Sequence, residues 1–416
     1  MSQTAVSYPP ANDVPEGARP LTFSRSDLVI IGGSVAAMAL AAIAFYAHLN
    51  EVLSFVCSGV AIALLAALVG RSVERLGDRL GAGATGVLQS ALGNLPELFI
   101  SFFALRAGLL TVVQSALIGS ILANLLLVLG AAFLVGGLKH GTQRFDHGRA
   151  RTTVVLLALA TAALVLPSLA AQLHSPAGGH ETQLSVAVAI ILLAIFALSL
   201  PASLRRQAEP VMGRSLVVEQ HPSPVGTDGS STQQSSADGP PTYEATGGHD
   251  KASAEGRVET HAEGHWPIWL ATGLLALAGV AAGLVSDWFV DALQPAIDAL
   301  HISPAFAGLV IVAIAGNAVE NVVGIQLAAR NQADYAVSVI VNSPLQIALV
   351  LAPALVLLSF LTATTLTLVF APLLVVSVVV AVIITAFIIF DGESNWLEGA
   401  ILIALYAIIA TLFWWG

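Results

Sequence analysis

The chain has 416 residues, of which 56% are hydrophobic and only 10% are charged, with a formal net charge of −10. Soluble domains carry about 25% charged residues, so this composition excludes an ordinary soluble domain and indicates an integral membrane protein. The net charge says little about nucleic acid, but the sequence has no basic patch with interleaved aromatic residues, so nucleic acid is not an expected partner. The single cysteine, Cys57, cannot form an intramolecular disulfide and is interpreted as a buried structural thiol.

Eleven stretches of the chain supply the roughly 20 apolar residues that a spanning helix needs. They are 28–48, 52–70, 84–105, 111–136, 152–172, 184–203, 266–290, 303–328, 334–359, 364–390 and 396–415. The polar, proline-containing residues before the first stretch do not have the short apolar core of a signal peptide. We therefore predict an all-α polytopic membrane protein with eleven transmembrane helices, preceded by an N-terminal cytoplasmic tail over 1–27.

The basic residues predict the orientation of these helices, because cytoplasmic loops carry an excess of Lys and Arg. With the N-terminus inside, 15 of the 16 Lys and Arg residues fall on the cytoplasmic side, and only Arg106 falls outside. Without the long connection between helices 6 and 7, the ratio is still 10 to 1. This asymmetry favours eleven spans with a cytoplasmic N-terminus and an external C-terminus.

The segment 204–265 differs from the rest of the chain, because it is rich in Gly, Ser, Pro, Asp, Glu and His. Such a composition buries too little apolar surface to fold. We predict a disordered cytoplasmic linker between two membrane halves. Its histidines could instead bind a regulatory metal; they are His221, His249, His261 and His265.

Two copies of one motif relate the two halves. GNLPE at 93–97 recurs as GNAVE at 316–320, and GSILANLLLVLG at 119–130 aligns with NSPLQIALVLAP at 342–353. One constant spacing, which relates Gly93 to Gly316 and is called the repeat offset below, aligns both pairs without a gap. Because the two motifs lie five spans apart, the second copy is inverted in the bilayer. We predict inverted five-helix repeats, helices 2–6 over 51–203 and helices 7–11 over 266–416, with an extra transmembrane helix over 28–50.

Each motif places an amide and an acid three residues apart, on one face of a helix: Asn94 with Glu97, and Asn317 with Glu320. A carboxylate inside the bilayer costs about 2.5–3.5 kcal/mol and is tolerated when it takes a proton or shares a cation. Helix breaks that free backbone oxygens are expected at Gly93, Pro96 and Gly316. Carboxylate, amide and carbonyl oxygens are the ligands of a hard cation such as Ca²⁺. A softer metal would call for a cluster of His and Cys residues, and the sequence has none.

The two acids also predict exchange chemistry. Burial favours a neutral carboxyl and a nearby cation favours a charged one, so Ca²⁺ and protons would compete for Glu97 and Glu320. One divalent ion or two protons would neutralise both acids at a single midplane site. Polar residues on the neighbouring predicted helices either line this site or make helix–helix hydrogen bonds; they are Ser120, Asn124, Ser343 and Gln346.

These motifs resemble those of the calcium/cation antiporter superfamily, and within it the calcium/proton exchangers (the CAX type). The resemblance covers GNLPE to GGLKH, the repeat that begins at GNAVE, and the ending DGESNWLEGAILIALYAIIA. It implies a secondary transporter that exchanges Ca²⁺ for H⁺ by alternating access. It also implies that Glu97 and Glu320 are the essential acids, with support from Asn94, Asn317, Ser120, Ser343 and Gln346. Glu74 and Asp287 match family acids loosely, and are either gating or proton-path groups or interfacial charges.

Some positions depart from the family pattern and leave alternatives open. Asn321 stands where the family commonly has His, and Leu95-Pro96 stands where Ala-Thr is usual; a proline there is similar to the sodium/calcium branch. The nearest alternatives are Na⁺/Ca²⁺ exchange and the exchange of Na⁺ or K⁺ for H⁺. A cation channel is an alternative of another class, although two inverted copies in one chain favour alternating access.

No enzyme motif and no cofactor are expected, so calcium ions, protons and the lipid bilayer are the predicted partners. The many Arg, Ala and Gly residues favour a bacterial plasma membrane over a vacuolar one. The sequence does not predict an oligomeric state.

Overall fold

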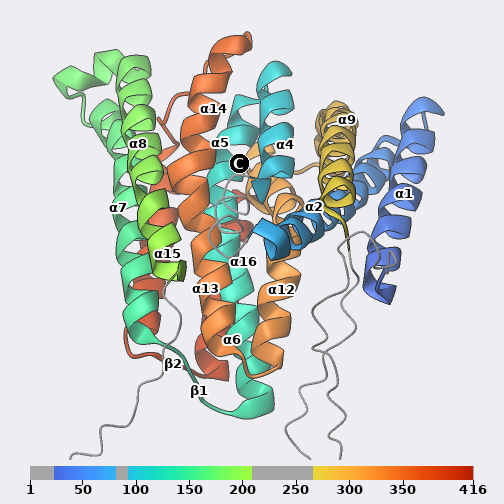
Figure 1. The fold of residues 1–416 in the computed structure, drawn as a ribbon. Helices are drawn as coiled ribbons and strands as arrows, with labels where there is room; N and C mark the ends of the chain where they lie inside the picture. The colour runs from blue at the N-terminus through green and yellow to red at the C-terminus, as the bar shows by residue number, and fades with distance from the viewer. Residues whose placement is uncertain (1–22, 81–91, 209–265, 416) are drawn as a thin grey trace, which may run out of the picture. The chain divides into compact units, whose positions relative to one another are not determined.

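The computed structural model describes residues 23–80, 92–208 and 266–415 (Figure 1). They belong to one unit, residues 1–208 with 264–416, and a second unit covers 209–263. The predicted tail up to residue 22 and the predicted linker from residue 209 onward lie outside the described residues.

The described part of the chain is predominantly helical. The first half contains α1 (Arg25–Tyr46), α2 (Glu51–Leu80), α4 (Leu95–Arg106), α5 (Leu110–Leu122), the π-helix η2 (Ala123–Val128), α6 (Leu129–His140), α7 (His147–Gln172), the 3₁₀-helix η3 (Pro176–His180) and α8 (Glu181–Ala208). A short strand, β1 (Gln143–Arg144), lies between α6 and α7 and pairs antiparallel with β2 (Glu393–Ser394) of the second half.

The second half, like the first, consists mainly of α-helices with short π-helices and a 3₁₀-helix. It contains α9 (Ile268–Leu300), α10 (Pro304–Phe306), the π-helix η4 (Ala307–Val312), α11 (Ala313–Gly316), α12 (Ala318–Ala329), α13 (Ala333–Gln346), the π-helix η5 (Ile347–Leu351), α14 (Ala352–Leu358), the 3₁₀-helix η6 (Ser359–Leu361), α15 (Pro372–Ile389) and α16 (Trp396–Trp414). The π-helices η2 and η5 overlap when the repeat offset is applied.

The described helices confirm an integral membrane protein. Among the described residues, nine helical runs are long and apolar enough to cross a membrane, and the bent pair Pro304–Gly316 and Asn321–Ala329 makes a tenth. Each of the eleven predicted stretches contains helix, but the third overlaps residues 81–91, which lie outside the described residues. Its described helix, α4, has only 12 residues. The count of eleven spans therefore stays a prediction.

The stretch predicted to be helical from residue 364 begins instead with an irregular segment, because residues 362–371 are not helical and α15 starts only after them. This segment packs against helices of the first half through three buried side chains, Leu366, Leu368 and Phe370. Gln114 Nε2 donates to two of its carbonyls at 3.2 and 2.9 Å. Ser168 accepts the N–H of Phe370 at 2.9 Å and donates to the carbonyl of Leu368 at 3.0 Å. Irregular backbone is tolerated at membrane depth when it is buried in protein and hydrogen-bonded, and its apolar composition alone could not reveal this.

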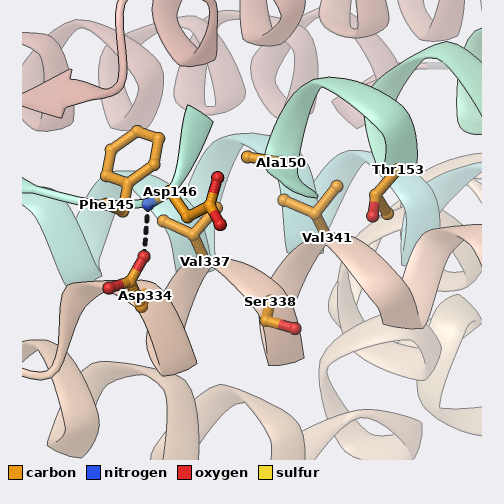
Figure 2. A pocket seen from close by; sticks show the side chains of 8 residues that line it. All are labelled: Phe145, Asp146, Ala150, Thr153, Asp334, Val337, Ser338 and Val341. Atoms are coloured by element: carbon orange, nitrogen blue, oxygen red, sulfur yellow. Dashed lines mark hydrogen bonds between the residues drawn. The ribbon is translucent and has the colours of Figure 1, made fainter. Parts of the chain in front are cut away.

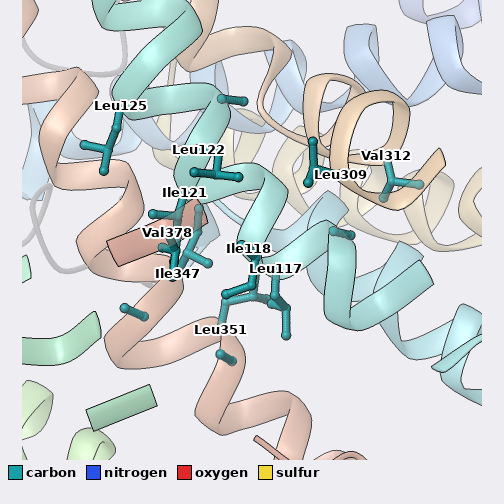
Figure 3. Packing of buried hydrophobic residues seen from close by; sticks show 14 of the residues in the cluster. Leu117, Ile118, Ile121, Leu122, Leu125, Leu309, Val312, Ile347, Leu351 and Val378 are labelled. Atoms are coloured by element: carbon teal, nitrogen blue, oxygen red, sulfur yellow. The ribbon is translucent and has the colours of Figure 1, made fainter. Parts of the chain in front are cut away.

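The apolar core lies where α5 and the π-helices meet (Figure 3). The helices approach closely at two glycines: a Cβ atom on Gly119 would overlap the backbone of Leu309, and one on Gly308 would overlap the carbonyl of Val112. Large side chains from α5, η2, η4, η5 and α15 surround this crossing, among them Ile118, Ile121, Leu122, Leu125, Ile347 and Val378.

The two motif helices lie inside this arrangement. Figure 1 shows α1, α2 and α9 together on one side and α7, α8 and α15 on the other. α4 contacts α5 and α9, and α12 contacts α6 and α13. The motifs are therefore surrounded by helices from both halves of the chain.

Candidate cation-binding site

Both sequence motifs lie at breaks between helices. Gly93 and Asn94 form a turn before α4 begins at Leu95. Asn317 is the single residue between α11, which ends at Gly316, and α12. The prediction that each asparagine and glutamate share one face of a continuous helix is therefore wrong, because each asparagine precedes the helix that carries its glutamate.

The first residues of α4 suit a helix start. Pro96 lies in the first turn, where the missing N–H of a proline costs no intrahelical hydrogen bond. Glu97 follows in the same turn, where the helix dipole favours a negative charge. The predicted helix break at Pro96 is thus a helix start, and it brings a carboxylate to the end of a helix inside the protein.

Glu97 is only 4% exposed and binds groups from both halves of the chain. Its Oε1 atom accepts a hydrogen bond from Ser120 Oγ of α5 at 2.6 Å, and another from Asn317 Nδ2. Gly316 leaves room for this carboxylate, because a Cβ atom there would overlap Glu97 Cγ. A carboxylate of the first motif is thus held by the second motif.

Asn317 is fully buried and lies at the centre of the hydrogen-bond network. Its Nδ2 atom also donates to Ser120 Oγ and to the carbonyl of Ala313, both at 3.0 Å. Its Oδ1 atom accepts from Asn124 Nδ2 at 3.2 Å and from Ser343 Oγ at 3.3 Å. Three polar side chains of the long helices α5 to α6 and α13 to α14 therefore converge on the two motifs.

A second, weaker contact joins Asn94 to Gln346. Asn94 is 9% exposed and donates from Nδ2 to Gln346 Oε1 at 3.5 Å, the limit of a hydrogen bond. Glu320 belongs to the first turn of α12, but its side chain lies outside the described part of the chain. Its pairing with Glu97 across the site stays a prediction.

The two candidate gating acids are located elsewhere. Glu74 is exposed near the end of α2 and forms an ion pair with Arg71 at 2.9 Å. Asp287 is half-buried in α9. Among the described residues, neither side chain belongs to the network around Glu97 and Asn317.

Oxygen atoms dominate the chemistry of this cluster. It gathers a carboxylate, two serine hydroxyls and the amides of Asn94, Asn124, Asn317 and Gln346. Within the described ranges, no three His, Cys, Asp or Glu side chains come together. Carboxylate and neutral oxygen ligands suit a hard cation. Sequence reasoning named Asn124 only as a residue that either lines the site or makes helix–helix hydrogen bonds, and the family resemblance did not include it among the site residues; its one signal was an amide one helical turn after Ser120.

A separate small pocket lies between the start of α7 and α13 (Figure 2). The backbone N–H of Asp146 donates to the Asp334 carboxylate there, and both residues are exposed. The pocket lining is Phe145, Asp146, Ala150, Thr153, Asp334, Val337, Ser338 and Val341. This contact ties the connection before α7 to the second half and is distinct from the cluster around Glu97.

A family model described as sodium/calcium exchanger protein matches residues 50–204 and 270–415, which is most of both halves. The chain belongs to the sodium/calcium exchanger protein family. Relatives similar to this chain include Ca(2+)/H(+) antiporters. The Ca(2+)/H(+) antiporter of Synechocystis sp. is 35% identical over 368 residues, which cover 88% of this chain and 91% of that protein. The Ca(2+)/H(+) antiporter ChaA of Bacillus subtilis is 33% identical over 381 residues, with coverages of 91% and 96%.

Solved structures of related proteins are also similar to this chain. The structure of native YfkE is 31% identical, with a TM-score of 0.70 over 92% of this chain and 99% of that one. The crystal structure of the H+/Ca2+ exchanger CAX is 16% identical, has a TM-score of 0.64 and shows that the fold is shared. The predicted membership of the calcium/cation antiporter superfamily, CAX type, is confirmed, and the relatives are transporters rather than enzymes.

Proposed function

We propose that the protein exchanges Ca²⁺ for H⁺ across a membrane. The observation that carries this proposal is the burial of Glu97 among hydroxyl and amide groups from both halves of the chain. A carboxylate in such surroundings can hold a cation or a proton. Relatives that are 33–35% identical and named Ca(2+)/H(+) antiporters support the choice of these two substrates.

The proposed site comprises two acids and their polar neighbours. Glu97 and Glu320 are the exchangeable ligands, and the supporting residues are Asn94, Asn317, Ser120, Ser343 and Gln346. Calcium enters as the substrate, and the two acids release protons as they take it. When protons return, they neutralise the carboxylates and weaken their hold on the cation. One Ca²⁺ ion and two protons carry the same charge, so the net charge of the site stays nearly constant when one replaces the other.

Alternating access is the proposed transport mechanism. The repeat offset relates the two motifs, and the π-helices η2 and η5 overlap under the same offset. Such π-helices frequently occur at functional sites. Two inverted repeats that meet at one site can expose it to each side of the membrane in turn.

The proposed orientation has a cytoplasmic N-terminus and an external C-terminus in a bacterial plasma membrane. Exposed aromatic side chains lie where the proposed spans begin and end, as expected because Trp and Tyr are enriched at both membrane interfaces. Trp269 and Trp396 are exposed at the starts of α9 and α16, and Tyr46 and Trp415 are exposed at the far ends of α1 and α16. Both starts would face the cytoplasm under this orientation.

Na⁺/Ca²⁺ exchange is the second candidate function. The description of the matching family model and the proline in the first turn of α4 favour it. Purified protein in proteoliposomes separates the candidates when one gradient is imposed at a time. Calcium uptake driven by a pH gradient, and unchanged when Na⁺ or K⁺ is replaced by choline, is the expected result. Uptake that needs a Na⁺ gradient and ignores the pH gradient would overturn the proposal.

A further inference from the structure

The orientation of the Asn317 amide bears on how the site releases its cation. Its NH₂ group faces the Glu97 carboxylate and the Ala313 carbonyl, while its Oδ1 atom faces the donors Asn124 Nδ2 and Ser343 Oγ. The reverse orientation would set an amide oxygen against two other oxygens. An NH₂ group cannot ligate a cation. With these hydrogen bonds, Asn317 therefore gives no oxygen ligand to an ion at Glu97.

Asn124 holds Asn317 in this orientation through a hydrogen bond, and this contact is called the anchor below. It is fully buried, and its Nδ2 atom donates both to Asn317 Oδ1 at 3.2 Å and to the carbonyl of Ser120 at 2.9 Å. Its own Oδ1 atom is buried and accepts no hydrogen bond from the described residues. The direction of the Asn124 amide is thus set by its two acceptors, and a reversed Asn124 would face both with an oxygen.

The second half of the chain has no such amide at the equivalent position. The repeat offset aligns Asn124 with Ile347, a fully buried apolar residue. Asn94, the counterpart of Asn317, donates to Gln346 at the longer distance of 3.5 Å. The anchor is therefore one-sided, although the motifs themselves are repeated.

We propose that Asn124 is a positioning residue for cation release. This inference rests on the proposed function and deepens it. Asn124, together with Ser343, holds the Asn317 oxygen away from Glu97. Asn317 must break these two hydrogen bonds before its oxygen can ligate a cation, so both donors weaken cation binding and speed release.

The variant Asn124→Leu tests the proposal, because leucine has the same number of side-chain heavy atoms, branched at the same carbon, and no donor. Losing one hydrogen bond from the competing orientation should lower the half-saturating calcium concentration by about two- to tenfold. Slower release should lower the maximal exchange rate at the same time. Loss of packing would instead reduce the amount of folded protein or raise the half-saturating concentration. A lower half-saturating concentration together with a lower maximal rate therefore distinguishes a positioning role from a structural one.

Two further variants complete the test. Ser343→Ala removes the other donor to Asn317 Oδ1 and should also lower the half-saturating concentration, which keeps the proposal testable if Asn124→Leu does not fold. Ser115→Ala is the matched control, since Ser115 is fully buried on α5 and its hydroxyl has no hydrogen-bond partner among the described residues. It should leave both constants unchanged.

The measurement is calcium-driven proton movement in proteoliposomes over a range of calcium concentrations. Calcium binding to the detergent-purified variants provides the affinity without transport. A half-saturating concentration that is unchanged or raised in folded Asn124→Leu and Ser343→Ala would overturn the anchor while wild-type exchange persists. If the wild-type protein itself moved no protons with calcium, the proposed function would fail as well, so the two failures are distinguishable.

Discussion

At the scale of single residues, the network around Glu97 combines close packing with hydrogen bonds. Gly316 is in contact with the Glu97 side chain, and Asn317 and Ser120 donate to its carboxylate. A buried carboxylate is stabilised by such donors and is costly without them. The position of Glu97 therefore depends on a glycine in the other half of the chain, at the end of α11.

Gly316→Ala should disrupt the site without changing any polar group. The added methyl group would displace the Glu97 side chain from Ser120 and Asn317, and we expect the exchange rate to fall by about tenfold or more. Initial calcium uptake into proteoliposomes measures the effect. Gly273→Ala is the matched control, because a Cβ atom at Gly273 of α9 meets no atom within 4 Å. Equal rates for both variants would show that Gly316 does not shape the site.

Sequence reasoning at this scale identified most of the residues that come together. The repeated motif pointed to Asn94, Glu97 and Asn317, because one offset relates them to equivalent groups. It did not distinguish the roles of the polar residues on the adjoining helices, since a hydroxyl or amide in an apolar stretch is equally suited to helix packing. The central role of Asn124 depends on which helices face each other, and that information is not local in sequence.

At the scale of secondary-structure elements, the irregular segment 362–371 shows where composition misleads. The segment has no charged residue and leads directly into an apolar helix, yet side chains of α5, α7 and α8 form hydrogen bonds with its backbone. A sequence window records hydrophobicity but does not record hydrogen bonds donated from elsewhere. The breaks at Asn94 and Asn317 were expected from Gly93, Pro96 and Gly316, although which residue begins each helix was not.

Gln114→Leu should destabilise the protein, because two partly buried carbonyls of the 362–371 segment would lose their donor. We expect the free energy of unfolding to fall by about 1–3 kcal/mol. Thermal unfolding of the detergent-purified protein provides the comparison. Gln183→Leu, at an exposed position of α8, serves as the control and should leave the midpoint unchanged. A Gln114→Leu midpoint equal to that of the control would mean that these hydrogen bonds contribute little.

At the scale of the whole molecule, two membrane halves are connected by a segment of different composition. The family match also falls into two parts, residues 50–204 and 270–415. The repeat offset, the basic-residue asymmetry and the hydropathy pattern all use long stretches of sequence, which is why class and family were predictable. The same patterns do not determine the number of spans, because the third predicted helix contains glycines, a proline and an acid.

Deletion of residues 210–260 tests the predicted linker. Its polar composition predicts a tether without a share in the exchange site, so the shortened protein should insert and retain most of the wild-type rate. Calcium uptake per folded protein is the measurement, with insertion checked by recovery in the membrane fraction and folding checked by size-exclusion chromatography. A shortened protein that is inserted and folded but inactive would assign the segment a direct part in transport.

Under the proposed function, one buried carboxylate site takes Ca²⁺ and H⁺ in turn. The most direct test records calcium uptake and proton release in the same proteoliposomes, for the wild type, Glu97→Gln and the exposed control Glu181→Gln. Glutamine keeps the shape of glutamate but can neither give up a proton nor carry the charge. We predict coupled fluxes in the wild type and in Glu181→Gln, and neither flux in folded Glu97→Gln. Coupled exchange at the wild-type rate in Glu97→Gln would refute a site shared by the two ions.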